Sequence, residues 1–129
     1  MVMLVLFSQC NFSITTAHIT NVKICAQIYN NRCESDNPDF STETPEINVS
    51  CTLKNAPENT RVKISWYYLG QKKISIDEVV LNSGNNSSPL DLHSSLSKPN
   101  NGWPKGEYEV DINVLDTHSE PVVRRFSVQ

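Results

Sequence analysis

The sequence predicts an all-β protein that folds as a single antiparallel β-sandwich of about seven to eight short strands. Three observations predict this class. Apolar and polar residues alternate with a period of two in several segments, turn residues recur about every 8–12 residues, and no segment shows the helical period of about 3.6. With 129 residues, 38% of them hydrophobic, the chain is long enough for one domain with one core.

The stretch from residue 98 to residue 114 shows the pattern most clearly. It starts with residues that break helices and form tight turns, namely Pro99, Asn100, Asn101, Gly102, Pro104 and Gly106. A strict alternation follows, which points Tyr108, Val110, Ile112 and Val114 to one side. This alternation is typical of an antiparallel strand with one buried side and one side in solvent.

The first residues indicate export. Residues 1–9 form an apolar run that is too short to span a bilayer and resembles the core of a signal peptide, although the basic residues that normally precede it are missing. Cleavage after Ala17, lipidation of Cys10 at a bacterial lipobox and an ordered first strand remain open as alternatives, and the residue before the cysteine departs from the lipobox pattern. We expect a leader over residues 1–17 and the sandwich over residues 18–129.

The four cysteines favour a disulfide over a zinc site. Cys10, Cys25, Cys33 and Cys51 form no Cys-x-x-Cys pair, and no histidine lies near them at zinc-binding spacing. In a short, turn-rich domain this indicates an oxidising compartment. Cys25 lies in an alternating segment and Cys33 in the polar loop after it, so the two could meet across a hairpin near Tyr29. We favour the pair Cys25–Cys33, and Cys33 with Cys51 stays open.

Two strands are expected in the middle of the chain. Residues 46–54 alternate so that Ile47, Val49, Cys51 and Leu53 point inward and Asn48, Ser50, Thr52 and Lys54 point to solvent. Residues 61–69 alternate so that Val62, Ile64, Trp66 and Tyr68 point inward and Arg61, Lys63, Ser65, Tyr67 and Leu69 point outward.

The remaining strands are less regular. A ragged strand is marked by Ile74, Ile76, Val79 and Leu81, another by Leu90, Leu92 and Leu96, and the last by Val122, Phe126 and Val128. We expect a bulge at Ser94–Ser95, where the apolar alternation is interrupted.

Three of these residues resemble the pattern of an immunoglobulin domain. In that family a buried cysteine precedes a buried tryptophan, and a tyrosine stands two residues before a second cysteine. Here Cys51 precedes Trp66 by 15 residues, and Tyr108 precedes Val110, which replaces the second cysteine. The resemblance implies an immunoglobulin-like sandwich without the usual disulfide between its sheets, with the hydroxyl of Tyr108 bonded to backbone upstream.

Residues 19–129 also resemble a family of prokaryotic extracytoplasmic immunoglobulin-like domains of uncharacterised function. The matching stretches are residues 40–49, 54–57, 62–68 and 96–110, and the last of them contains the unusual run Asn-Gly-Trp-Pro-x-Gly-x-Tyr at residues 101–108. Members often follow a lipoprotein signal, which implies a chain that is secreted or held at the membrane by a lipid anchor. The likeness brings no catalytic residues with it.

Candidate binding residues occupy two places. Trp103 lies in a turn, where it could be an exposed anchor for a partner or could fold back over the open end of the core. Arg61, Lys63 and Tyr67 share one face of their strand and could form a binding patch of basic and aromatic character, or an ordinary mixed surface.

Other classes of function find little support. The net charge is −3, and the 11 basic residues form no large cluster, so no nucleic-acid partner is expected. The three histidines are scattered and no Gly-x-Ser-x-Gly motif occurs, so we do not expect an enzyme. The acidic loop around Asp36 lacks the spacing of a calcium loop, so neither a metal nor another cofactor is expected.

The sequence therefore predicts a non-catalytic, extracytoplasmic interaction module. It would bind a protein or a glycan at the cell surface through the sheet face of Arg61, Lys63 and Tyr67, or through the end loops around Trp103. The alternative is an immunoglobulin-like protease inhibitor or assembly chaperone that acts through an edge strand or through loops.

Overall fold

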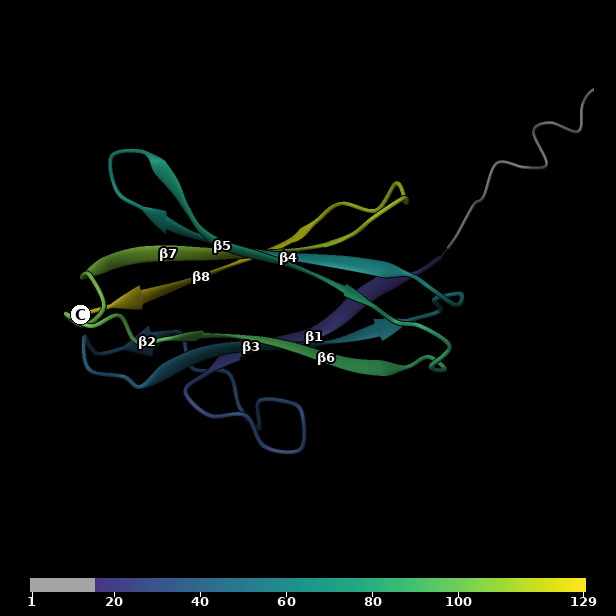
Figure 1. Cartoon of the computed structure of the whole chain (residues 1–129), viewed down its shortest axis with the longest axis horizontal. Helices are drawn as coiled ribbons and strands as arrows, with labels where there is room; N and C mark the ends of the chain where they lie inside the picture. Colours follow the sequence, from purple (N-terminus) through teal and green to yellow (C-terminus); the bar gives the residue numbers. More distant parts are fainter. Residues whose placement is uncertain (1–15) are drawn as a thin grey trace, which may run out of the picture.

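The structure, a computed structural model, describes residues 16–129, which form two packed β-sheets (Figure 1). Cys10 and the expected leader up to residue 15 lie outside the described residues. The eight strands are β1 (His18–Cys25), β2 (Asp39–Phe40), β3 (Glu46–Lys54), β4 (Arg61–Leu69), β5 (Lys73–Asn82), β6 (Leu90–Ser97), β7 (Gly106–Val114) and β8 (Val122–Val128). The expected all-β sandwich is confirmed, and among the described residues there is no helix that could cross a membrane.

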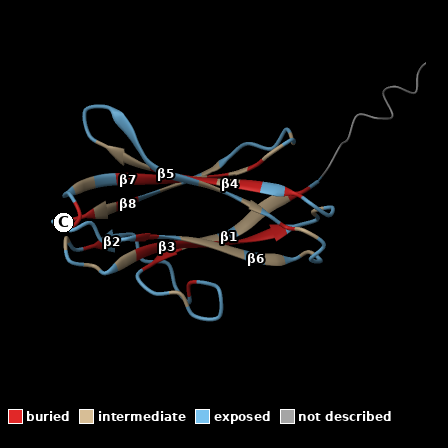
Figure 2. Cartoon of the chain, in the orientation of Figure 1, coloured by how far each residue is buried: buried red, intermediate tan, exposed pale blue. Residues whose placement is uncertain are grey.

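The two sheets differ in width. One has five strands in the order β2-β8-β7-β4-β5, and the other has three in the order β1-β3-β6. All neighbours are antiparallel except β2 and β8, which are parallel over two residues. The inward-facing residues of both sheets form one core, and the buried positions gather on the strands between the layers (Figure 2).

Aromatic side chains make up much of this core. Phe126 stacks on Tyr108 with ring centroids 5.1 Å apart, and the ring of Trp66 meets Phe126 edge-on at 6.1 Å. The indole Nε1 of Trp66, a residue that is 1% exposed, donates a hydrogen bond of 3.2 Å to Oγ of Ser94 on the opposite sheet. A buried N–H requires an acceptor, which Ser94 supplies.

The expected bulge at Ser94–Ser95 is wrong. The register of β3 with β6 runs without a break from Glu46↔Ser97 to Leu53↔Leu90. Ser94 occupies an inward position, and it interrupts the apolar pattern because it bonds to Trp66, not because the alternation shifts. The register shifts instead in β1 between Thr20 and Lys23, and in β5, where Ile76 is the extra residue opposite Trp66 and Tyr67.

The outer side of the three-stranded sheet is covered, not in solvent as expected. Asn48, Ser50 and Thr52 are buried because the loop after β1 folds across them, seen below the lower layer in Figure 1. Asn48 Nδ2 donates to the carbonyl of Cys25 at 3.2 Å, and the amide of Cys33 donates to Ser50 Oγ at 2.9 Å.

The expected disulfide Cys25–Cys33 is present and holds this loop, which turns at Asn30–Asn31. Cys51 is a buried free thiol. Burial, and then the charge of Asp91, raise the pKa of Cys51 to about 12, so the thiol stays protonated and unreactive.

Ala17, which the sequence assigned to the leader, is 2% exposed and belongs to the core cluster. The packed sandwich therefore includes at least one residue before His18.

The packing of Trp66 leads to a first prediction. Trp66→Ala should lower the free energy of unfolding by roughly 3–5 kcal/mol, because it leaves a cavity and an unpaired Ser94 hydroxyl. Urea denaturation measures this loss. Val80→Ala, at a position on β5 that is 47% exposed, is the control and should cost less than about 0.5 kcal/mol. A loss at Trp66 as small as that of the control would show that the indole is not packed between the sheets.

The loop leads to a second prediction. Reduction of Cys25–Cys33, which are separated by 8 residues, should lower the free energy of unfolding by roughly 2–3 kcal/mol. Denaturation with and without a reductant measures the effect, and the intact mass should rise by two hydrogens. The double variant Cys25→Ser/Cys33→Ser should not respond to the reductant. A wild-type protein that gains this mass without losing stability would contradict the prediction.

Candidate functional site

The expected binding face on β4 carries the predicted residues, but each of them is already engaged. Tyr67 lies under the ammonium of Lys73, 4.3 Å from its ring centroid. Lys63 Nζ is 3.8 Å from Glu78 on the neighbouring β5. The face therefore offers paired charges and a covered aromatic ring, not an open basic patch.

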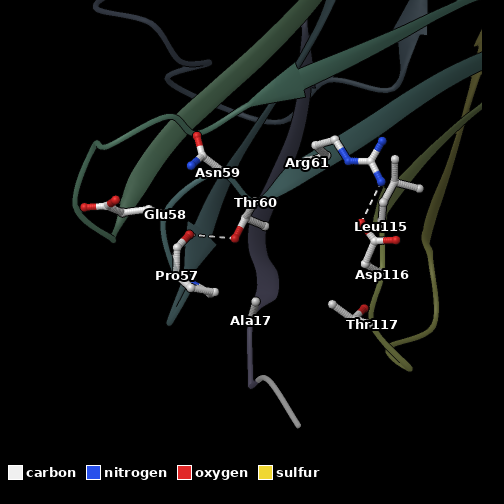
Figure 3. Close-up of a pocket in the computed structure, with 9 residues that line it drawn as sticks. All are labelled: Ala17, Pro57, Glu58, Asn59, Thr60, Arg61, Leu115, Asp116 and Thr117. Atoms are coloured by element: carbon white, nitrogen blue, oxygen red, sulfur yellow. Dashed lines mark hydrogen bonds and ion pairs between the residues drawn. The ribbon is translucent and has the colours of Figure 1, made fainter. Parts of the chain in front are cut away.

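Arg61 lies apart from Lys63 and Tyr67, at the end of the sandwich where the chain enters. Its Nη2 is 2.6 Å from Oδ2 of Asp116 (Figure 3). Both residues line a shallow hollow of about 160 Å³ together with Ala17, Pro57, Glu58, Asn59, Thr60, Leu115 and Thr117. Thr60 Oγ1 donates to the carbonyl of Pro57 at 2.7 Å, so three of the polar side chains in this hollow bond to neighbours within it.

The centre of the same sheet face holds an acidic pair that the sequence analysis missed. Glu109 and Asp111 stand two residues apart on β7 and point outward. Lys73 Nζ is 2.7 Å from Glu109 Oε2 and 3.7 Å from Asp111 Oδ2, and Arg125 Nε is 3.3 Å from Glu109 Oε1. The sequence signal was the pair of acids at positions i and i+2, which alone does not reveal that Glu109 is 3% exposed.

The two carboxyl groups titrate as a pair with opposite shifts. Burial, and then the hydrogen bond and charge of Glu109, raise the pKa of Asp111 from 3.8 to about 6. Burial opposes ionisation of Glu109 too, but hydrogen bonds with Lys73, Asp111 and Arg125 hold its pKa below the ordinary value. The hydrogen bond to Glu109 raises the pKa of Lys73. The buried oxygen Oδ1 of Asp111 has no hydrogen-bond partner among the described residues, which fits a carboxyl group that is costly to ionise.

Of the two alternatives for Trp103, the structure shows the one in which the side chain covers the end of the core. Trp103 is 4% exposed and folds back over the end of the core, where it meets Tyr108 edge-on at 6.3 Å. Its Nε1 donates to the carbonyl of Thr44 at 2.6 Å and its backbone amide to Thr42 at 2.9 Å. Gly102 permits this course, because its φ of +80° suits glycine and a Cβ there would lie 2.9 Å from the carbonyl oxygen of Thr42.

Trp103 nevertheless forms one wall of an apolar groove of about 230 Å³ at this end of the sandwich. The other lining residues are Tyr68, Ile76, Pro99, Pro104 and Tyr108. Both tyrosine hydroxyls donate to backbone, Tyr68 to Lys105 at 2.8 Å and Tyr108 to Pro104 at 2.5 Å. The groove therefore presents aromatic and aliphatic carbon. We call it the end groove.

The side of the sandwich between β5 and β6 is open. Ile74 and Ile76 on β5 are 52% and 42% exposed, although they lie on the side of the sheet that carries the core. Farther along the same side is a second hollow of about 370 Å³, here called the side groove. It is lined by Asn31, Leu81, Asn82, Asn86, Leu90, Asp91, Leu92 and His93.

Comparison with known proteins adds no assignment. No protein-family model matches the sequence, and no curated protein is significantly similar to it. Within residues 16–129, no three or more His, Cys, Asp or Glu side chains gather as they would around a metal ion. The function must therefore be argued from the surface itself.

The acidic pair leads to a third prediction. The folded protein keeps the proton of Asp111 up to about pH 6, whereas the unfolded chain releases it near the ordinary aspartate pKa of 3.8. The folded state thus binds more protons between these values, and its stability falls as the pH rises through this window. Asp111→Asn removes this loss of stability. Above pH 6 the free energy of unfolding of the variant should exceed that of the wild type by on the order of 1–2 kcal/mol, and near pH 4 the two values should be equal.

Thermal unfolding at a series of pH values measures this difference. Glu107→Gln, an exposed position on the same face of β7, is the matched control and should show no such pH dependence. An Asp111→Asn variant that is less stable than the wild type at pH 7.5 would show that the ionised carboxylate stabilises the fold.

Proposed function

We propose that this chain is a non-catalytic, extracytoplasmic module that binds a partner protein along the open side between β5 and β6. The observation that carries the proposal is the exposure of Ile74 and Ile76 beside the end groove. Monomeric proteins rarely leave a continuous apolar surface in water unless something binds there. A rigid sandwich that holds such a surface in place is suited to recognition.

A protein partner fits this surface better than a glycan. Ligand sites combine apolar walls with a few polar groups that fix orientation. In the end groove the two tyrosine hydroxyls and the indole N–H are already bonded to backbone, which leaves aromatic and aliphatic walls. Such walls suit the apolar side chains of a protein.

Export is supported by the disulfide Cys25–Cys33, which is compatible with an oxidising compartment. We also propose that the sandwich is immunoglobulin-like and that the chain belongs with the prokaryotic extracytoplasmic domains it resembles. Cys51, Trp66 and Tyr108 are all buried between the sheets, and the hydroxyl of Tyr108 donates to backbone four residues upstream, as in a tyrosine corner.

Site-specific photo-crosslinking tests the proposed function, and it is the fourth prediction. A photoreactive amino acid in place of Ile76 should cross-link a single protein in an extract of the cell envelope and secreted fraction. The same residue in place of Val123, which is 49% exposed on the opposite face, should not.

The captured protein, identified and purified, should bind the wild type. Ile76→Asp should weaken this binding about tenfold or more, because it places a carboxylate against an apolar contact, whereas Val123→Asp should leave it unchanged. Equal cross-linking from positions 76 and 123, or equal binding by the two aspartate variants, would refute the open side as the binding surface.

A further inference from the structure

The unequal width of the two sheets leaves part of one inner face bare. The five-stranded sheet ends at β5 and the three-stranded sheet ends at β6, and these edges lie on the same side of the sandwich, because residues of both strands line the side groove. Ile74 pairs with Tyr68 across the strands and shares its inward side, yet 52% of it is exposed. In Figure 1 the β4–β5 hairpin rises away from the lower layer at the left. No described strand lies opposite the inner face of this hairpin.

The second edge of β6 is unpaired among the described residues. β6 spans Leu90–Ser97 and pairs only with β3, over its full length. Its other edge presents a row of backbone N–H and C=O groups, which is a template for another strand. The inward-facing residues of β6 are Leu90, Leu92, Ser94 and Leu96.

The end groove and the side groove lie at the two ends of this edge. The side groove is lined by Leu90 and Leu92, where β6 begins, and by Leu81, where β5 approaches its end. The end groove is lined by Pro99, two residues after β6 ends, and by Ile76 of β5. A strand that ran beside β6 would therefore pass from one groove to the other, with alternate side chains directed toward β5.

The charges along this path do not select a basic partner. Asp91 lines the side groove, but Arg32 Nη1 lies 3.9 Å from its Oδ2, and Thr52 donates a hydrogen bond of 3.2 Å to its Oδ1. Asp77 pairs with the core residue Trp66, so its carboxylate lies on the inward side of β5, where it is exposed. The choice of an extended strand therefore depends on the free edge of β6 and on the uncovered isoleucines.

We propose that the partner supplies one extended strand, which pairs antiparallel with β6 and becomes the fourth strand of the smaller sheet. Its inward side chains are apolar and fill the two grooves against Ile74 and Ile76, and its other side chains are polar and point to solvent. This inference rests on the proposed function and specifies its mode of binding. Main-chain hydrogen bonds would supply affinity and the grooves specificity.

A partner strand on the free edge of β5 would not cover the exposed isoleucines. The bulge at Ile76 and the inward Asp77 interrupt that edge near its middle, and such features discourage pairing. A strand added to β5 would also extend the wider sheet and leave Ile74 and Ile76 uncovered. A strand on β6 covers them.

The fifth prediction concerns a fusion protein in which a designed strand is attached to the end of this chain. The chain ends at Gln129, at the same end of the sandwich as the β4–β5 hairpin (Figure 1). Three strand spacings of about 4.8 Å separate β8 from β5, and a flexible linker of about 12 glycine and serine residues spans about 17–21 Å. After this linker we add about seven residues of alternating lysine and valine. The tether raises the local concentration, so that even a weak pairing is populated.

Amide hydrogen exchange should show on the order of tenfold slower exchange at alternate residues of Leu90–Ser97 in the fusion, and thermal unfolding should occur at a higher temperature. The matched control carries prolines in place of the valines, which removes hydrogen-bond donors from the added strand without altering the sandwich. It should show neither effect. Unchanged exchange in β6, or slower exchange in β5 or β1 instead, would overturn the inference.

A competition experiment separates this inference from the proposed function. The added strand should abolish cross-linking of the partner from position 76, and the proline version should restore it. If the fusion protects β6 but the partner still cross-links, the partner binds by another mode and only the inference fails. If position 76 of the wild type never cross-links a protein, the proposed function fails. If it cross-links a second copy of this chain and sedimentation shows a dimer, the occupant is the chain itself and the inference is wrong.

Discussion

The aromatic packing around Tyr108 is the interaction on which the rest of this structure depends. Its ring stacks on Phe126 and meets Trp103 and Tyr68 edge-on, while its hydroxyl donates to the carbonyl of Pro104. One side chain thus joins the core between the sheets to the turn that closes the end of the sandwich. Because burial, and then the charge of Tyr68, raise the pKa of Tyr108 to about 12, the hydroxyl remains a donor throughout the physiological range. The same ring forms a wall of the end groove, so the contacts that stabilise the core also give this groove its shape.

The open side leaves apolar side chains uncovered, and the rest of the fold offsets this cost. Three strands opposite five cannot cover the inner face of the wider sheet, and the isoleucines of β5 stay in water in the free protein. The buried aromatic core and the disulfide stabilise the sandwich without them. The bulge at Ile76 and the inward Asp77 interrupt the edge of β5, which limits unwanted pairing between copies.

Much of the fold follows from the sequence, because the period-two pattern determines which side chains face the core. It locates the strands, and the spacing of Cys25 and Cys33 suggests the disulfide. The period-two pattern does not reveal which residues lie next to each other on neighbouring strands or across the two sheets. The polar Ser94 suggested a bulge because its partner, Trp66, is 28 residues away. The pairing of Glu109 with Lys73 and Arg125 likewise depends on the register of four strands, β5, β4, β7 and β8, and the burial of Trp103 depends on a backbone carbonyl 59 residues away.

Ala17 and the end groove lie at opposite ends of the sandwich. Ala17 packs into the core at the end where His18 pairs with Lys54, whereas the end groove lies beyond the opposite end, where Glu46 pairs with Ser97. The nine residues of β3 separate these ends by about 27 Å. An attachment upstream of Ala17 would therefore hold the domain at one end of its long axis, and the apolar groove would face away from that attachment, at the other end.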